Sequence, residues 1–218
     1  MNLREILNKI EILNKIEIKV VYDIGANMGK WSNIMKDLIP NAEFYLFEAH
    51  PYYINNLKDT GFKYFIDLLS DEVGKEIDFY DSTTSGESYY KENSVWNINY
   101  IPTKKISNTI DNIAFVNNIE NPDFIKLDTQ GSELDILNGC KNIINNTKII
   151  LCEMPIMEYN VGAPNIYEYL NNFDKLGFYP MNIEKSHFMD NLLVQIDIIF
   201  MRKDLKNELL EINKMLLI

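Results

Sequence analysis

The stretch Val21-Tyr-Asp-Ile-Gly-Ala-Asn-Met-Gly29 decides the fold, because it joins an apolar strand to the start of an amphipathic helix. Residues 18–24 predict a short buried strand, and residues 29–39 have helical periodicity as far as Pro40. Glycine at positions 25 and 29 permits a tight turn, where a bound molecule can approach the backbone and the helix N–H groups. The stretch therefore predicts a strand–turn–helix unit with a ligand at the carboxyl end of the strand.

Strands and helices alternate along the chain on both sides of this turn. The expected strands are residues 43–48, 62–69, 124–127, 148–152, 178–183 and 195–201, and the expected helices are residues 51–60, 132–144 and 164–176. Such alternation implies right-handed βαβ units. We expect an α/β fold with helices on both faces of a mostly parallel sheet.

Three segments depart from this alternation. Residues 77–80 and 95–101 predict strands around the polar segment Ser82–Ser88, which indicates an inserted hairpin or a long loop of the kind that often forms a lid. Residues 1–17 predict an N-terminal helix that packs on the domain or, alternatively, joins two copies in a homodimer. Residues 203–218 predict a closing helix. With the core at residues 18–202 and no linker, we expect a single domain over residues 1–218.

Composition excludes several classes of partner. The net charge of −11 and pI of about 4.7 argue against nucleic acid, which is bound by clustered Lys and Arg. No apolar run approaches the ~20 residues that span a bilayer. The two cysteines lack a Cys-x-x-Cys spacing and no secretory signal opens the sequence, so we expect free thiols and a cytoplasmic protein.

The residues around the turn narrow the class of ligand. A dinucleotide fold prefers glycine at the position of Asn27, so a nicotinamide-dependent oxidoreductase is favoured only by the general strand–turn–helix pattern. Asp23 ends the first strand, where its charge suits an amino group or a sulfonium. Glu48 ends the second strand and is placed to accept hydrogen bonds from a ribose diol. The alternative is a glycine-rich turn beside two unrelated acids.

Three motifs in this order resemble the FkbM family of S-adenosylmethionine-dependent methyltransferases. They are Asp23–Gly29, Phe47-Glu-Ala-His-Pro51, and Ile125-Lys-Leu-Asp-Thr-Gln-Gly-Ser-Glu133 followed by Leu137-Asn-Gly139. The resemblance covers most of the chain, from Val20 to Arg202. It implies a class I methyltransferase fold, which is a Rossmann-like sheet of seven mostly parallel strands with one reversed strand. It also implies O-methylation of a hydroxyl on a sugar, a glycan or a natural-product intermediate.

The resemblance implies a donor site for S-adenosylmethionine at the ends of the strands. The first turn lines the methionine part, the acid after the second strand holds the ribose, and the end of the third strand flanks the adenine. The residues expected to bind the donor are Asp23, Gly25, Asn27, Gly29, Glu48, Ala49, His50, Asp67, Leu68 and Asp128.

Methyl transfer from a sulfonium is an in-line displacement, so the protein has to align the acceptor oxygen and remove its proton. The candidate catalytic residues are Asp128, Glu153 and His187, the last of which we place in a loop before the final strands. Each has a structural alternative: Asp128 hydrogen-bonds the next helix, Glu153 ends its strand, and His187 lies on the surface. We expect Glu133 to act as a first-turn acid of its helix.

The remaining expectations concern a metal and the acceptor. Asp128 and Glu153 could hold a divalent cation, but the sequence offers no evident third ligand, so we expect no metal. The acceptor is expected between Ser82–Asn93 and Pro155–Pro164, where aromatic residues would stack on a sugar; these are Tyr89, Tyr90, Trp96 and Tyr159. A non-catalytic partner protein that keeps the fold is the alternative from another class.

Overall fold

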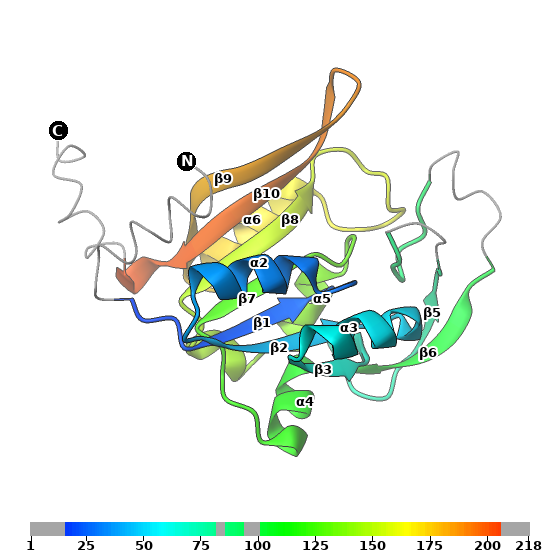
Figure 1. Cartoon of the computed structure of the whole chain (residues 1–218). Coiled ribbons are helices and arrows are strands. Elements are labelled where there is room, and N and C mark those ends of the chain that lie inside the picture. Colours follow the sequence, from blue (N-terminus) through cyan, green and yellow to red (C-terminus); the bar gives the residue numbers. More distant parts are fainter. Residues whose placement is uncertain (1–15, 82–85, 94–100, 206–218) are drawn as a thin grey trace, which may run out of the picture.

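A seven-stranded sheet in the order β3-β2-β1-β7-β8-β10-β9 forms the centre of the molecule (Figure 1). The structure, a computed structural model, describes residues 16–81, 86–93 and 101–205. The strands of this sheet are β1 (Val20–Ile24), β2 (Glu43–Glu48), β3 (Lys63–Ile66), β7 (Phe124–Leu127), β8 (Ile149–Pro155), β9 (Phe178–Met189) and β10 (Leu192–Arg202). Strand β10 runs opposite to the other six strands of this sheet. The prediction of seven strands with one reversed strand is confirmed.

Helices cover both faces of this sheet. They are α2 (Lys30–Leu38), α3 (Ile54–Thr60), α4 (Ile110–Asn117), α5 (Glu133–Asn138) and α6 (Ile166–Lys175), with short 3-10 turns η1 (Pro51–Tyr53), η2 (Ile143–Asn145) and η3 (Lys203–Leu205). Alternate side chains of a strand point to opposite faces. Accordingly Val21 packs in the cluster with Met35 of α2, while Tyr22 packs in the cluster with Phe173 of α6. All five residues of β1 are buried as a result.

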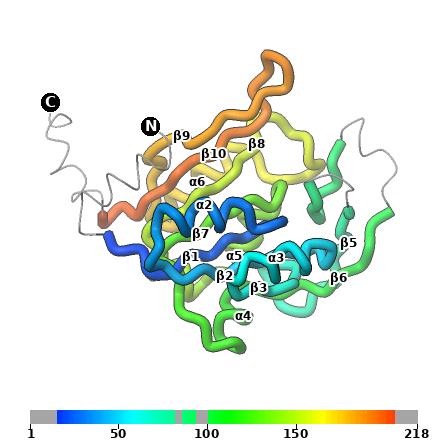
Figure 2. Tube along the Cα trace, viewed as in Figure 1, coloured from blue at the N-terminus to red at the C-terminus, as the bar shows by residue number. Residues whose placement is uncertain are grey.

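A small second sheet lies beside the β3 edge (Figure 2). The strand expected at residues 62–69 divides into β3 and β4 (Leu68–Leu69), because β4 leaves the main sheet and pairs with β6 (Thr103–Asn108). Strand β5 (Glu76–Phe79) pairs with β6 in antiparallel register, so the inserted hairpin is present. The strand expected at residues 95–101 falls on residues 94–100 except for its last residue, and so lies outside the described residues. The sequence also missed α4, which Thr109 caps by accepting a hydrogen bond from the Asn112 N–H.

Other boundaries differ from the prediction for local reasons. The helix expected at residues 132–144 ends at Asn138. The next residue, Gly139, packs so closely on another segment that a Cβ there would lie 2.3 Å from the Ser70 carbonyl oxygen. His187 lies within β9 and not in a loop, because the β9–β10 hairpin extends to Met189. The helices predicted at residues 1–17 and 203–218 lie mostly outside the described residues, and the described residues Ile16 and Glu17 are not helical. Of residues 203–218, the structure describes Lys203–Leu205, which form η3.

Both cysteines, Cys140 and Cys152, are buried as free thiols. Among the described residues, no helix combines the length and the apolar character that crossing a membrane requires.

Candidate active site

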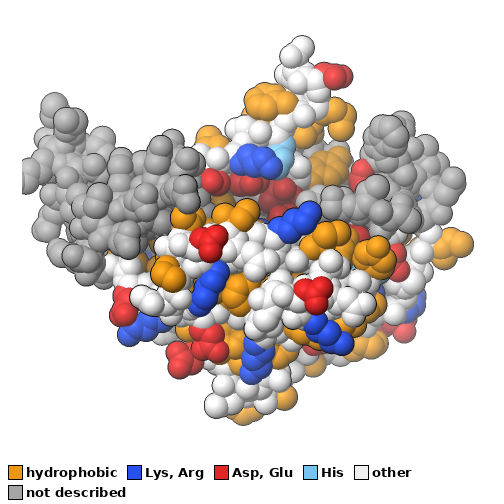
Figure 3. Space-filling model, in the orientation of Figure 1, with side chains coloured by type: hydrophobic (Ala, Val, Ile, Leu, Met, Phe, Trp, Pro, Cys, Tyr) orange, Lys and Arg blue, Asp and Glu red, His pale blue; other side chains and the backbone are white. Residues whose placement is uncertain are grey.

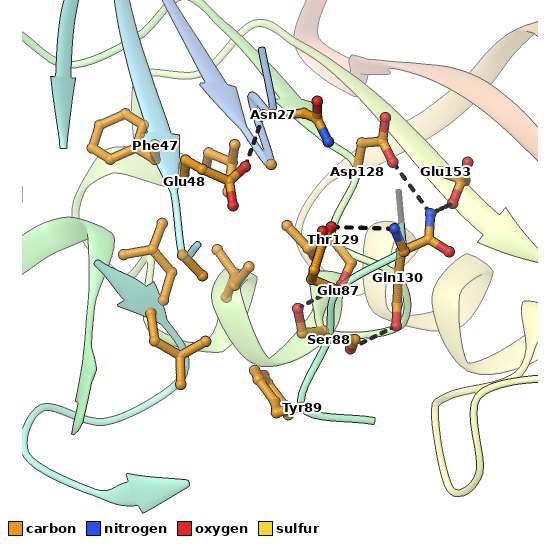
Figure 4. Close-up of a pocket in the computed structure, with 18 of the residues that line it drawn as sticks. Asn27, Phe47, Glu48, Glu87, Ser88, Tyr89, Asp128, Thr129, Gln130 and Glu153 are labelled. Atoms are coloured by element: carbon orange, nitrogen blue, oxygen red, sulfur yellow. Dashed lines mark hydrogen bonds between the residues drawn. The ribbon is translucent and has the colours of Figure 1, made fainter. Parts of the chain in front are cut away.

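A cavity of about 450 Å³ opens at the carboxyl edge of the main sheet (Figure 4). The ends of β1, β2, β7 and β8 form its walls, together with the loop at residues 86–89. Of the residues predicted for the site, those that line it are Gly25, Asn27, Glu48, Ala49, Asp67, Leu68, Asp128, Glu153 and His187. Asp23, Gly29 and His50 are not part of its lining.

The turn after β1 requires glycine at two positions. Gly25 has φ +76°, and a Cβ there would lie 1.9 Å from the carbonyl oxygen of Asp128. This contact leaves no room for any side chain, so the turn after β1 and the turn after β7 touch backbone to backbone. Gly29 has φ +71°, and a Cβ there would lie 2.6 Å from the Thr60 methyl. Gly29 therefore lets α2 approach α3, which explains its absence from the cavity wall.

Asp23 supports the turn from beneath and does not reach the cavity. It is fully buried. Its carboxylate accepts a 2.6 Å hydrogen bond from the Ser32 hydroxyl and forms an ion pair with Lys126 at 3.0 Å. Lys126 also contacts Asp128 at 3.3 Å and the Gly25 carbonyl at 3.3 Å. Burial alone would lower the pKa of Lys126, but the carboxylates of Asp23 and Asp128 hold this pKa above its ordinary value. Lys126 is therefore a buried cation that ties β1 to β7, and sequence reasoning missed it.

Glu48 is held in the cavity wall by backbone groups. Its Oε2 accepts a 2.7 Å hydrogen bond from the Asn27 N–H, and its Oε1 accepts one of 2.8 Å from the His50 N–H. Each carboxylate oxygen has a second lone pair for a ligand. Burial raises the pKa of Glu48, and the two backbone N–H groups act in the opposite direction. Glu48 is thus a fixed pair of acceptors at the position that the sequence predicted for a diol.

His50 caps the turn that follows Glu48 and stays outside the cavity. Its ring nitrogen accepts a hydrogen bond from the Tyr52 N–H, and its other nitrogen lies 3.4 Å from Asp81. Beyond Glu48, Asp67 and Leu68 both line the cavity. The Asp67 carboxylate accepts a 3.2 Å hydrogen bond from the Asn108 side chain, and the apolar residues beside it include Phe79.

Two acidic side chains, Asp128 after β7 and Glu153 on β8, line the opposite side of the cavity, and Asp197 of β10 lies close to Glu153. Glu153 accepts hydrogen bonds from the side-chain amides of Gln130 at 2.6 Å and Gln195 at 2.7 Å. The Gln130 amide also lies 3.5 Å from Asp128. Burial, followed by the nearby charges of Asp128, Glu133 and Asp197, raises the pKa of Glu153 well above its ordinary value. The amide of Gln130 thus stands between the two carboxylates that the sequence suggested as cation ligands.

His187 forms a pair with Asp197 of the neighbouring strand. Its Nε2 lies 3.1 Å from the Asp197 Oδ1, and both side chains are largely shielded from solvent. Burial raises the pKa of Asp197, and the charge and hydrogen bond of His187 partly offset this rise. Ligand atoms of Glu153, His187 and Asp197 lie within 4.8 Å of one another. The expectation that no metal is needed stays a prediction, and unchanged turnover after dialysis against EDTA is the result that would support it.

Glu133 shapes the turn after β7 from inside the protein. It is 1% exposed and accepts hydrogen bonds from the Thr129 N–H at 2.8 Å, the Gly131 N–H at 3.0 Å and the Tyr169 hydroxyl at 2.5 Å. Burial raises the pKa of this carboxyl, while hydrogen bonds from the Tyr169 hydroxyl and from the backbone N–H groups of Glu133 and Thr129 act in the opposite direction. It is therefore a structural clamp on residues 128–131, a role that goes beyond the expected first-turn acid.

The loop at residues 86–93 is fastened across the cavity. Ser88 donates a 2.9 Å hydrogen bond to the Gln130 carbonyl, and the hydroxyls of Tyr89 and Tyr90 both bind Asp135 of α5, at 2.9 Å and 2.8 Å. Tyr159 donates a 2.6 Å hydrogen bond to the Gln130 side chain. Three of the predicted stacking aromatics thus use their hydroxyls inside the protein, and Trp96 lies outside the described residues.

The chain is similar to known methyltransferases in sequence and in fold. The chain is 23% identical over 193 residues to the 2-O-methyltransferase NoeI of Sinorhizobium fredii (strain NBRC 101917 / NGR234), with 79% of each protein covered. A solved structure of magnesium protoporphyrin IX methyltransferase (ChlM) from Synechocystis PCC 6803 with bound SAH superposes with a TM-score of 0.52 at 8% identity. That alignment covers 91% of this chain and 80% of the other.

The structural likeness concerns the fold, since its sequence identity is low. The sheet order, the reversed β10 and the cavity at the carboxyl edge agree with this likeness. The family described as "Methyltransferase FkbM domain" matches residues 23–199, which run from Asp23 of β1 to Ile199 of β10. On this match the chain belongs to the FkbM methyltransferase family.

Proposed function

We propose that this protein transfers a methyl group from S-adenosylmethionine to a hydroxyl of a sugar, a glycan or a natural-product intermediate. The observation that carries the proposal is Glu48, whose two oxygens are each held by one backbone N–H and face a cavity bordered by Gly25. A ribose has two adjacent hydroxyls that donate to such a carboxylate. Membership of a methyltransferase family supports the same assignment.

With the ribose bound at Glu48, the rest of the donor can be placed along the cavity. Adenine would lie between Asp67, Leu68 and Phe79, and the methionine part would follow the turn at Gly25 and Asn27 toward Asp128. There the clustered carboxylates suit the positive charges of the sulfonium and the amino group. The buried hydroxyl of Thr129 also borders the cavity and has no hydrogen-bond partner among the described residues, so it is available to the donor.

The chemistry needs alignment and a proton acceptor. The acceptor oxygen forms a bond to the methyl carbon as the carbon–sulfur bond breaks, and the electron pair of that bond leaves on the neutral thioether. We assign the proton of the hydroxyl to His187, whose ring Asp197 orients and whose protonated form Asp197 stabilises. Asp128 and Glu153 border the same space. In this proposal they hold the donor and the acceptor.

Support for oxygen as the methylated atom comes from the relative named as a 2-O-methyltransferase, at 23% identity. No specific acceptor follows from this name, because the loops that select an acceptor vary within one fold.

Isothermal titration with S-adenosylhomocysteine tests the proposal directly. We expect saturable binding in the micromolar range for the unaltered protein and binding weakened by about 10- to 100-fold for Glu48→Ala, since hydrogen bonds to a charged group contribute about 1.5–3 kcal/mol. NADH titrated under the same conditions is the control for a nicotinamide site. Binding of NADH without binding of S-adenosylhomocysteine would contradict the proposal.

A further inference from the structure

A second cavity of about 390 Å³ lies on the other side of the Gly25 turn. The start of α2 forms one wall and the β9–β10 hairpin forms the other, with residues that include Trp31, Glu184 and Lys185. In the space-filling view, acidic side chains gather in a band between α2 and this hairpin, with a histidine beside them (Figure 3). This cavity is not the place where the sequence suggested an acceptor.

The two cavities share part of their walls. The residues that line both are Gly25, Asn27, Asp128, Glu153 and His187. With the donor placed in the first cavity as proposed above, the sulfonium lies at this shared wall. A hydroxyl that enters from the second cavity therefore meets the methyl group at the side chains assigned to the reaction. We propose that the second cavity is the acceptor site and that it binds a neutral sugar ring, an inference that rests on the proposed function.

The lining of the second cavity suits a polyhydroxylated ring. Trp31 is half-buried and borders the cavity; it packs edge-on against Phe124, with 5.7 Å between ring centroids, and the Lys126 ammonium lies 5.7 Å from its ring centroid. An aromatic surface of this kind packs against the apolar C–H face of a sugar. Carboxylates such as those of Asp197 and Glu184 accept hydrogen bonds from hydroxyls. An apolar face beside several hydroxyls is the chemical signature of a saccharide.

The charges near the shared wall favour a neutral ring over an acidic one. Asp128, Glu153 and Asp197 all border the second cavity. The buried cation beside them, Lys126, is already paired with Asp23 and Asp128. A carboxylate or phosphate next to the reacting hydroxyl would lie close to these acids, and like charges repel. Lys30 and Lys185 lie at the exposed rim and can contact only more distant groups.

The region predicted from the sequence is a less suitable acceptor site. A cavity of about 210 Å³ lies there, bordered by Met157 and Tyr159. This cavity shares Glu153 and Gln195 with the donor cavity, but His187 does not line it, and the Tyr159 hydroxyl binds the side chains of Gln130 and Gln195 in its wall. An acceptor in that cavity would have to displace this network, whereas the second cavity reaches His187 directly.

The test is a glycan array probed with protein saturated with S-adenosylhomocysteine. We expect retention on neutral glycans and none on glycans whose only distinguishing sugar is a uronate. Trp31→Ala is expected to weaken retention at least 10-fold, Trp31→Phe less than 3-fold, and the matched control Met157→Ala not at all. Binding of S-adenosylhomocysteine should be unchanged in all three variants, which also establishes that they are folded.

Met28→Trp gives a second test, which does not remove the packing of Trp31 on Phe124. Met28 borders only the second of these two cavities, so a larger side chain there should block glycans and leave donor binding intact. Absence of neutral-glycan binding, preference for uronates, or loss of binding in Met157→Ala with retention in Trp31→Ala would each overturn the acceptor site. Failure of the unaltered protein to bind S-adenosylhomocysteine would instead contradict the proposed function itself.

Discussion

The two sides of the donor cavity hold their acidic groups in different ways. On one side, backbone N–H groups of Asn27 and His50 hold Glu48. On the other side, Glu153 is held by the side-chain amides of Gln130 and Gln195. Backbone donors persist whatever side chains the neighbouring residues carry, whereas side-chain donors can be replaced one at a time. We infer that the donor side is a fixed frame and that the reaction side can be altered without loss of the fold.

The largest effect should come from breaking the frame at Gly25. Gly25→Ala would place its Cβ 1.9 Å from the Asp128 carbonyl oxygen and impose a side chain on φ +76°. Both turns at the sheet edge must then move apart. We expect no measurable binding of S-adenosylhomocysteine by calorimetry and a lower melting temperature by circular dichroism. The matched control is Gly61→Ala, because Gly61 has φ +74° but no heavy atom within 4 Å of such a Cβ. Donor binding that survives in Gly25→Ala would show that the turns are not a rigid frame.

On the reaction side, His187→Ala should slow the chemistry without weakening donor binding. General base catalysis contributes about 10²- to 10⁴-fold in rate, so we expect a loss of kcat within this range. Asp197→Asn should give a smaller loss, since the ring remains and only its orientation and charge stabilisation change. Rapid-quench measurement of a single turnover, with a radiolabelled methyl donor, separates this step from product release. Equal loss of donor affinity in both variants would assign the pair to donor binding.

A smaller effect is expected for Glu48→Gln. The amide keeps one acceptor oxygen but presents an N–H₂ group to a backbone N–H, either that of Asn27 or that of His50. Affinity for S-adenosylhomocysteine should fall about 10-fold, which corresponds to about 1.4 kcal/mol. Titration calorimetry with adenosine as a second ligand locates the loss, because adenosine retains the ribose and lacks the methionine part. An unchanged affinity for adenosine would remove Glu48 from the ribose site.

The same contrast explains how much could be predicted from the sequence. Gly25 and Glu48 lie at the ends of apolar strands, so the local pattern was enough to place both at the cavity. Asp23 was expected to line the ligand site, but it is buried beside Lys126 and does not line the cavity. Lys126 is 103 residues away, so nothing in the local sequence indicates this pair. The Glu153 contacts with Gln130 and Gln195 are of the same long-range kind.

The differences in the fold have a related origin. The polar strand β6 has two consecutive lysines, which do not read as a strand until β5 provides its antiparallel partner. Placing His187 within β9 likewise depends on the partner strand β10, whose Gln195 is opposite it. Elements with a buried face of their own, such as β1 and β2, were located to within a residue or two. Elements whose extent depends on a partner strand, such as β6 and the end of β9, were not.

The smallest expected effect concerns the stability of the reaction side. Glu153 is buried among other acids and its folded-state pKa is raised, so the charged form is less favourable in the folded protein than in the unfolded chain. The cost is absent in acid below the unfolded-state pKa, and it grows as pH rises toward and through the folded-state pKa. Glu153→Gln removes this charge and should raise the melting temperature by about 2–4 °C near pH 8, which corresponds to about 1 kcal/mol.

The sign of the pH dependence distinguishes this mechanism from simple repacking. If the gain comes from the removed charge, it must shrink as pH falls, and the melting curves of Glu153→Gln and the unaltered protein should coincide near pH 4. Glutamine can also turn its N–H₂ group toward the Gln130 and Gln195 amides, and that loss of acceptors would lower stability equally at every pH. A difference that stays constant between pH 4 and pH 8 would therefore mean that hydrogen bonding, and not charge, governs this side of the cavity.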